Sequence, residues 1–155
     1  MSRLTVGSLE GLSENSNVIS VPAGHTLNAV DGLQIGGVTQ GAWITWTPSY
    51  SAGAGSGTVS TNYARYTKAG THVTCLMHFT VTNANTASGF LGFTLPFSQS
   101  NALGAGAGRE VALSNKVVGC ESLAGNSVGI QFYDGVTCWV TNSQIKLLYV
   151  YESTT

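Results

Sequence analysis

The chain has 155 residues, and only 8% of them are charged, against about 25% in an ordinary soluble domain. Its net charge is -1 and its six lysines and arginines are scattered, so it lacks the basic cluster that nucleic-acid binding requires. It contains neither an apolar run of about 18 residues, as a membrane-spanning helix needs, nor a signal peptide. We therefore expect neither nucleic acid nor a membrane as a partner, and synthesis in a cytoplasm without processing.

Residues 1–42 combine serine, asparagine and glycine with isolated apolar residues. The apolar residues are too dispersed to form a core of their own, yet too frequent for a solvated tail. We therefore predict an extended arm whose apolar side chains are buried against sister subunits or a neighbouring protein. The arm residues predicted to contact a partner are Val18, Ile19, Val21, Pro22, Leu27, Leu33 and Ile35.

Residues 43–155 carry strand signals and almost no helical periodicity. The clearest strand is 72–82, in which an apolar face alternates with a mostly polar one. The predicted strands are 43–50, 59–68, 72–82, 90–95, 110–118, 128–133, 137–141 and 145–152. About eight short strands between glycine- and serine-rich loops are typical of an antiparallel sandwich. The predicted fold is all-β: a jelly-roll-like antiparallel β-sandwich over 43–155, preceded by the arm.

Several glycine-containing segments are predicted to be turns or loops. Asp134-Gly135 is expected to form a tight hairpin turn, and Asn142-Ser143 to separate the last two strands. The segments 52–57 and 104–108 are expected to be the most flexible loops. Glycines in the second could hold a phosphate in principle, but it matches no nucleotide-binding motif, so a surface loop or subunit contact is favoured.

No constellation for catalysis or metal binding stands out. The acidic residues are Glu10, Glu14, Asp31, Glu110, Glu121, Asp134 and Glu152, and no pair has a sequence reason to meet. His72 and His78 share a strand face but lie about 20 Å apart, too far to bind one metal ion. Three copies of one histidine could still converge on an ion around a threefold axis. We predict no catalytic residue, no cofactor and no metal within a single chain.

The cysteines and aromatic residues are interpreted mainly as packing residues. Three widely spaced cysteines, Cys75, Cys120 and Cys138, form neither a disulfide framework nor a zinc motif. Trp43 and Trp46 are three apart and should face opposite sides of a strand. The later aromatic residues are Tyr133, Trp139, Tyr149 and Tyr151. Core or interface packing is favoured for these, although exposed aromatic rings could also stack on sugars.

Particular segments resemble proteins of tailed bacteriophages. The segment 17–27, followed by Asp31-Gly32-Leu33, resembles runs in phage tail and virion surface proteins that wrap into threefold shafts or arms. The segments similar to the C-terminal β-sandwich of phage tail fibres are WTPSY at 46–50, ARYTKAG at 64–70, 73–81, FTLPF at 93–97 and 145–151. The resemblance implies a homotrimer on the virion.

Only about 40 residues precede the predicted sandwich, unlike the long shaft of a typical fibre. This favours a non-enzymatic capsid decoration or cement protein whose arm binds the major capsid protein or tail components. The alternative is a tail-fibre or tail-tip component that recognises a host-surface glycan. A third, from another class, is a polysaccharide depolymerase. In each case the expected location is the virion.

Overall fold

The computed structural model describes residues 34–35, 38–39, 41–123 and 126–154, which belong to the compact unit Gln34–Thr155. Ile35, one of the predicted arm contacts, lies in strand β1 (Gln34–Ile35), which pairs antiparallel with β2 (Val38–Thr39). The other predicted arm contacts, Val18, Ile19, Val21, Pro22, Leu27 and Leu33, lie outside the described residues. Binding through the arm, and the division of the chain at residue 42, therefore stay predictions.

The remaining strands form one antiparallel sheet of nine, in the order β3-β5-β6-β11-β8-β9-β10-β7-β4. Their bounds are β3 (Ile44–Thr45), β4 (Tyr50–Ala54), β5 (Thr58–Ala69), β6 (His72–Asn83), β7 (Ser88–Thr94), β8 (Gln99–Glu110), β9 (Val117–Ser122), β10 (Ser127–Phe132) and β11 (Gln144–Ser153). The described residues include no helix, and so none long and apolar enough to cross a membrane. The predicted all-β antiparallel fold is confirmed.

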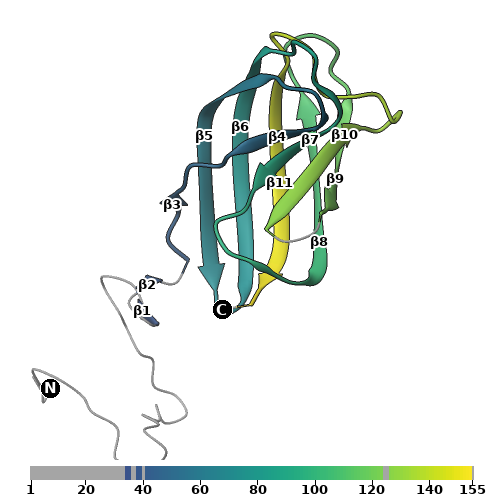
Figure 1. Cartoon of the computed structure of the whole chain (residues 1–155). Helices are drawn as coiled ribbons and strands as arrows, with labels where there is room; N and C mark the ends of the chain where they lie inside the picture. Colours follow the sequence, from purple (N-terminus) through teal and green to yellow (C-terminus); the bar gives the residue numbers. More distant parts are fainter. Residues whose placement is uncertain (1–33, 36–37, 40, 124–125, 155) are drawn as a thin grey trace, which may run out of the picture. The chain divides into compact units, whose positions relative to one another are not determined.

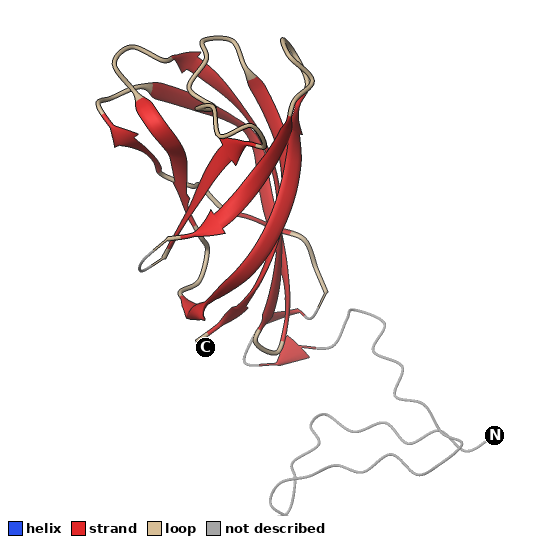
Figure 2. Ribbon diagram, turned by 90° about the vertical axis from the view of Figure 1, so that its right-hand side faces the viewer, coloured by secondary structure: helices blue, strands red, loops and turns tan. Residues whose placement is uncertain are grey.

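The sheet curls so that its opposite halves enclose the core, as the layers of a sandwich do (Figures 1 and 2). Its outermost strands, β3 and β4, are consecutive in the chain, and the segment between them joins the two edges. On one side the Trp46 amide donates to the Ala64 carbonyl of β5 at 3.2 Å; on the other the Ser49 carbonyl accepts from the Thr94 amide of β7 at 3.0 Å. The Tyr50 and Thr61 hydroxyls, on β4 and β5, lie 2.8 Å apart.

The core follows the alternation that the sequence predicts for 72–82. On β6 the inward side chains are all buried, and its other face turns outward. Strand β11 pairs with β6 and contributes a second alternating row. The buried residues of the two strands are Val73, Cys75, Met77, Phe79, Val81, Ile145, Leu147, Tyr149 and Tyr151. This pairing of two long alternating strands fixes which residues face outward across the sheet.

The expectation of a flexible loop at 104–108 is wrong, because these residues lie in the middle of β8 and pair with β11. Gly104, Gly106 and Gly108 face inward. A Cβ at Gly104 would collide with the Tyr149 ring, and one at Gly106 or Gly108 with β11 backbone. The glycines therefore allow β11 to pack closely against β8, and they do not mark a flexible loop. Similarly, 52–54 of the predicted loop 52–57 belong to β4.

Two predicted strands are also corrected. The range 110–118 is the end of β8, a loop and the start of β9, because the Glu110 carboxylate binds the backbone amides of 112–115 and turns the chain. The range 137–141 forms no strand, and the adjacent Cys138 and Trp139 are both buried instead of alternating between two faces. Asp134-Gly135 does form a turn, with the Gly135 amide bonded to the Phe132 carbonyl at 2.9 Å, but a loop follows it.

Candidate functional site

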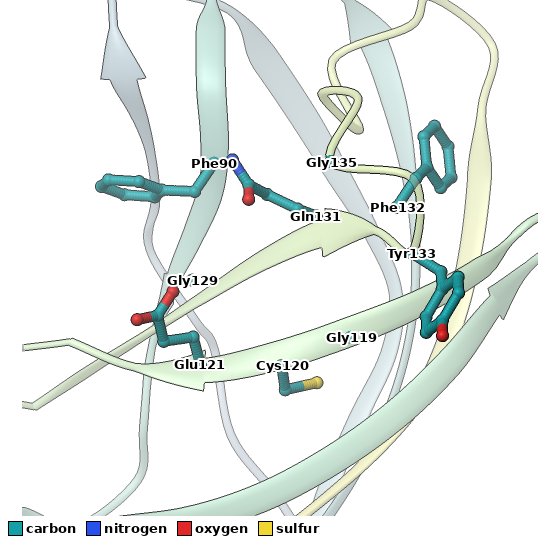
Figure 3. Close-up of a pocket in the computed structure, with 9 residues that line it drawn as sticks. All are labelled: Phe90, Gly119, Cys120, Glu121, Gly129, Gln131, Phe132, Tyr133 and Gly135. Atoms are coloured by element: carbon teal, nitrogen blue, oxygen red, sulfur yellow. The ribbon is translucent and has the colours of Figure 1, made fainter.

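The outer face of β9 and β10 carries a groove of about 320 Å³, drawn in Figure 3. Its lining comes from β7, β9, β10 and the turn after β10. The lining residues are Phe90, Gly119, Cys120, Glu121, Gly129, Gln131, Phe132, Tyr133 and Gly135. A second hollow of about 430 Å³, lined by Lys116, Val117, Tyr133 and Asp134, adjoins it through the shared Tyr133. We call the first of these the β9–β10 groove.

Glycine forms the floor of the groove. Gly119 of β9 pairs with Gln131 of β10. The next pair on the same face is Glu121 with Gly129, so each pair holds one glycine and one polar residue. A Cβ placed on Gly119 would meet no atom within 4 Å, because the space above it is open. Gly129 packs under the Leu123 side chain. A sheet face that carries side chains at every position would lack this depression.

Glu121 and Gln131 supply the polar groups of the groove. Both side chains are exposed, and neither forms a hydrogen bond with another described residue. The carboxylate is an acceptor, and the amide is both donor and acceptor. Together they offer a hydroxyl-bearing ligand partners of both kinds.

Aromatic residues lie at opposite sides of the groove (Figure 3): Tyr133 at one side, and at the other Phe90, whose ring points away from Gln131 and packs over Gly53 of β4. Tyr133 is 90% exposed, the most exposed large aromatic side chain among the described residues. Its backbone amide donates to the Val117 carbonyl at 2.9 Å, which ties the turn to β9. Phe90 lies on β7, and its carbonyl accepts a bond from the buried Trp139 indole at 3.1 Å. Both rings are therefore attached to backbone that is anchored to the domain.

An ion pair fixes the turn that carries Tyr133. Lys116 Nζ lies 2.6 Å from Asp134 Oδ2, and the Val136 amide donates to Asp134 Oδ1 at 3.1 Å. The hydrogen bond from Lys116 holds the pKa of the Asp134 carboxyl below its usual range. Lys116 also lies 5.4 Å from the centre of the Phe132 ring. The charge of Asp134 is thus paired, whereas that of Glu121 faces the groove.

The acids and histidines considered in the sequence are not brought together into a catalytic or metal centre. In the described part of the chain no three histidine, cysteine or acidic side chains gather closely enough to hold a metal ion. Glu110 is buried and bonded to backbone amides, and Glu152 lies on the outer face of β11. His72 and His78 lie on the outer face of β6, as predicted. The acids Glu10, Glu14 and Asp31 lie outside the described residues.

The predicted packing role holds for most aromatic residues and for the cysteines. Trp139, Tyr149 and Tyr151 are buried in the core, and of the four later aromatic residues Tyr133 alone is exposed. Trp43 is 49% exposed, whereas Trp46 packs against the core. All three cysteines are free thiols, and burial raises the pKa of each to about 12.

Sequence reasoning did not identify Phe90, Gly119, Gly129 or Gln131 as groove residues. The sequence does place glycines at outward positions of two strands. These glycines indicate a groove only when the pairing of the two strands is known. In comparisons with protein-family models, with curated proteins and with solved structures, nothing matches this chain.

Proposed function

We propose that the protein is a non-enzymatic surface component of a tailed-phage particle, and that its β9–β10 groove binds a host-surface glycan. The exposed Tyr133 ring beside the uncommitted Glu121 and Gln131 carries this proposal. Sugar rings stack on aromatic faces through their C–H groups, while their hydroxyls need donors and acceptors. The groove supplies both over a glycine floor.

The groove favours a neutral or amine-bearing sugar over an acidic one. Glu121 is the acidic residue that lines it, and no lysine or arginine does so. A carboxylated sugar would place its negative charge against Glu121, which disfavours binding. Glucose-, galactose- or hexosamine-type residues of a cell-surface polysaccharide therefore fit best.

Capsid decoration or cementing, in a homotrimer as the phage resemblance implies, is the second proposal. Composition supports it: a chain with 8% charged residues and dispersed apolar residues in its N-terminal segment suits durable packing against other virion proteins. Depolymerase activity is the third and least supported, because no pair of free carboxylates lines the groove.

Adsorption to host cells tests the glycan proposal. The full chain should bind cells or a glycan array, and Tyr133→Ala should lose most of that binding. Tyr63→Ala is the control, because Tyr63 is another tyrosine with an exposed side chain but lies on β5, outside the groove. Gly119→Val provides a second variant, since a Cβ at Gly119 would meet no atom within 4 Å and the added side chain would occupy the groove floor. Equal binding by all four proteins would overturn the proposal.

A further inference from the structure

The outer face of β6, β11 and β8 is apolar at its centre, although solvent surrounds it. Leu148 is 45% exposed in the middle of this face. It pairs with Leu76 on β6 and with Ala107 on β8, so three apolar residues lie in one row across the sheet. In the next row Val150 pairs with Ala105 on β8 and with Thr74 on β6. We call the five apolar residues of these two rows the apolar face.

Opposite charges lie at the two ends of the apolar face. Lys146 and Glu152 flank Leu148 and Val150 on the same side of β11, so the outward residues follow the order lysine, leucine, valine, glutamate. Lys146 and Glu152 are about 20 Å apart. Both are exposed, and neither forms an ion pair with a described residue. Arg109 on β8 pairs with Lys146, so the lysine end carries additional positive charge, and exposed Arg65 on β5 borders the face beside Leu76.

We propose that the apolar face docks on the same face of a second copy of this chain, with the two β11 strands antiparallel. When two β11 strands face each other in opposite directions, the outward residues of one strand are complementary to those of the other. Lys146 then lies opposite Glu152 of the second copy, and Leu148 opposite its Val150. The contact is isologous, so each ion pair occurs twice.

The charges select this arrangement over the other two-fold packing of the same faces. A two-fold axis parallel to the strands would place Lys146 opposite Lys146 and Glu152 opposite Glu152, and like charges oppose association. An axis perpendicular to the strands, level with Tyr149, gives the complementary pairing instead. The small Ala105 and Ala107 side chains allow the facing sheets to approach to the usual distance of about 10 Å.

The size of the face indicates a weak contact. The three strands β6, β11 and β8, about 4.8 Å apart, and a length of about 20 Å give roughly 300 Å² in projection for each copy. This corresponds to the small, transient class of interfaces rather than to an obligate one. Such a contact gains strength when copies are held together on a particle. It is a separate surface from the lining of the β9–β10 groove, and it is also separate from the threefold assembly that the resemblance implies.

Paired charge reversals test the proposal by sedimentation velocity over a series of concentrations. At the same concentration, the native chain should reach twice the mass of the Lys146→Glu variant. This holds whether two single copies or two trimers associate through the apolar face. Glu152→Lys should behave like Lys146→Glu, with the dissociation constant of each raised roughly tenfold or more. An equimolar mixture of the two variants should recover the association, because each reversed charge then meets an opposite one.

Lys116→Glu is the charge-matched control for association, since it makes the same charge change at a lysine outside the apolar face and should leave the mass unchanged. Because it also breaks the Lys116–Asp134 ion pair beside the groove, it serves as a control for association only. Thermal unfolding of every variant establishes that it is folded. Three results would overturn the proposal: no doubling by the native chain up to about 1 mM, equal masses for the native chain and the reversal variants, or a mixture that fails to associate. Glycan binding by the same proteins is scored separately, so failure of one proposal leaves the other standing.

Discussion

The Glu110 carboxylate accepts a hydrogen bond at 3.2 Å from the backbone amide of Gln144, 34 residues further along the chain. Glu110 ends β8 and Gln144 begins β11, so this bond joins the ends of two paired strands. The same carboxylate binds the amides of 112–115 and the Ser114 hydroxyl. One buried acid thus organises the loop that leads from β8 to β9.

We predict that Glu110→Gln lowers the free energy of unfolding by about 3 kcal/mol at pH 7, because amide–carboxylate bonds weaken and one acceptor oxygen is lost. Urea unfolding at pH 7 measures this. Glu121→Gln is the matched control, since Glu121 is exposed and forms no hydrogen bond with a described residue. Equal midpoints for the two variants would show that the amide contacts contribute little.

Stability should also depend on pH through Glu110. Burial alone would raise the pKa of its carboxyl, but the bonds from the backbone amides of Ser114, Ala112, Leu113 and Gln144 outweigh this and lower the pKa to about 2. The unfolded value is near 4.3. The stabilising contribution is therefore complete above about pH 4.3 and is lost as the pH falls towards 2. Urea titrations between pH 7 and pH 2 should show a smaller decline for Glu110→Gln than for the native chain.

The glycines of β8 give a second stability prediction. Gly104→Ala should destabilise the domain by about 2 kcal/mol or more, because the added methyl group collides with the Tyr149 ring. Gly119→Ala is the matched control: it lies in a strand, its Cβ would meet nothing within 4 Å, and its stability should stay within about 0.5 kcal/mol of the native value. Chemical denaturation compares the two. A stable Gly104→Ala would mean that β8 and β11 are not packed as described.

Closure of the sheet between β4 and β5 can be tested at Tyr50. Its hydroxyl is 2.8 Å from that of Thr61, and its ring lies 5.3 Å from the ring of Phe79. Tyr50→Phe keeps the ring and removes the hydroxyl, so a loss of about 1 kcal/mol is expected. Tyr50→Ala removes both and should cost about 3 kcal/mol or more. If the two variants are equally stable in thermal unfolding, the ring does not contribute to closure.

Thiol chemistry tests how far the three cysteines are shielded: Cys75 and Cys138 are buried, and Cys120 is partly buried beside the groove. Since burial raises the pKa of Cys75, Cys120 and Cys138 to about 12, almost no thiolate is present at pH 8. A thiol reagent such as dithionitrobenzoate should react slowly with the folded chain. In guanidinium chloride all three thiols should react rapidly. Fast reaction without denaturant would place at least one cysteine in an open site.

The sequence predicts strand 72–82 well because its alternation is regular and its buried partner, β11, alternates too. It fails at 104–108 because glycine has low strand propensity by itself. What makes these glycines suitable is β11, about 40 residues away in the chain: its Tyr149 ring lies against Gly104, and its backbone lies against Gly106 and Gly108. The groove escapes prediction for the same reason. Gly119 and Gln131 become neighbours only through the pairing of β9 with β10, and single-chain patterns do not specify pairing.

Because the two edges of the sheet are joined, copies of the chain can be held at high local concentration without forming fibrils. Edge strands with long rows of free backbone donors recruit further strands and start cross-β growth. Here the terminal strands are short: β3 has two residues, and β4 has five with an irregularity near Gly53. Buried Pro48, between them, has no N–H to offer. A chain with so little charge repels its copies weakly, and its short edges provide the protection against amyloid that charge usually supplies.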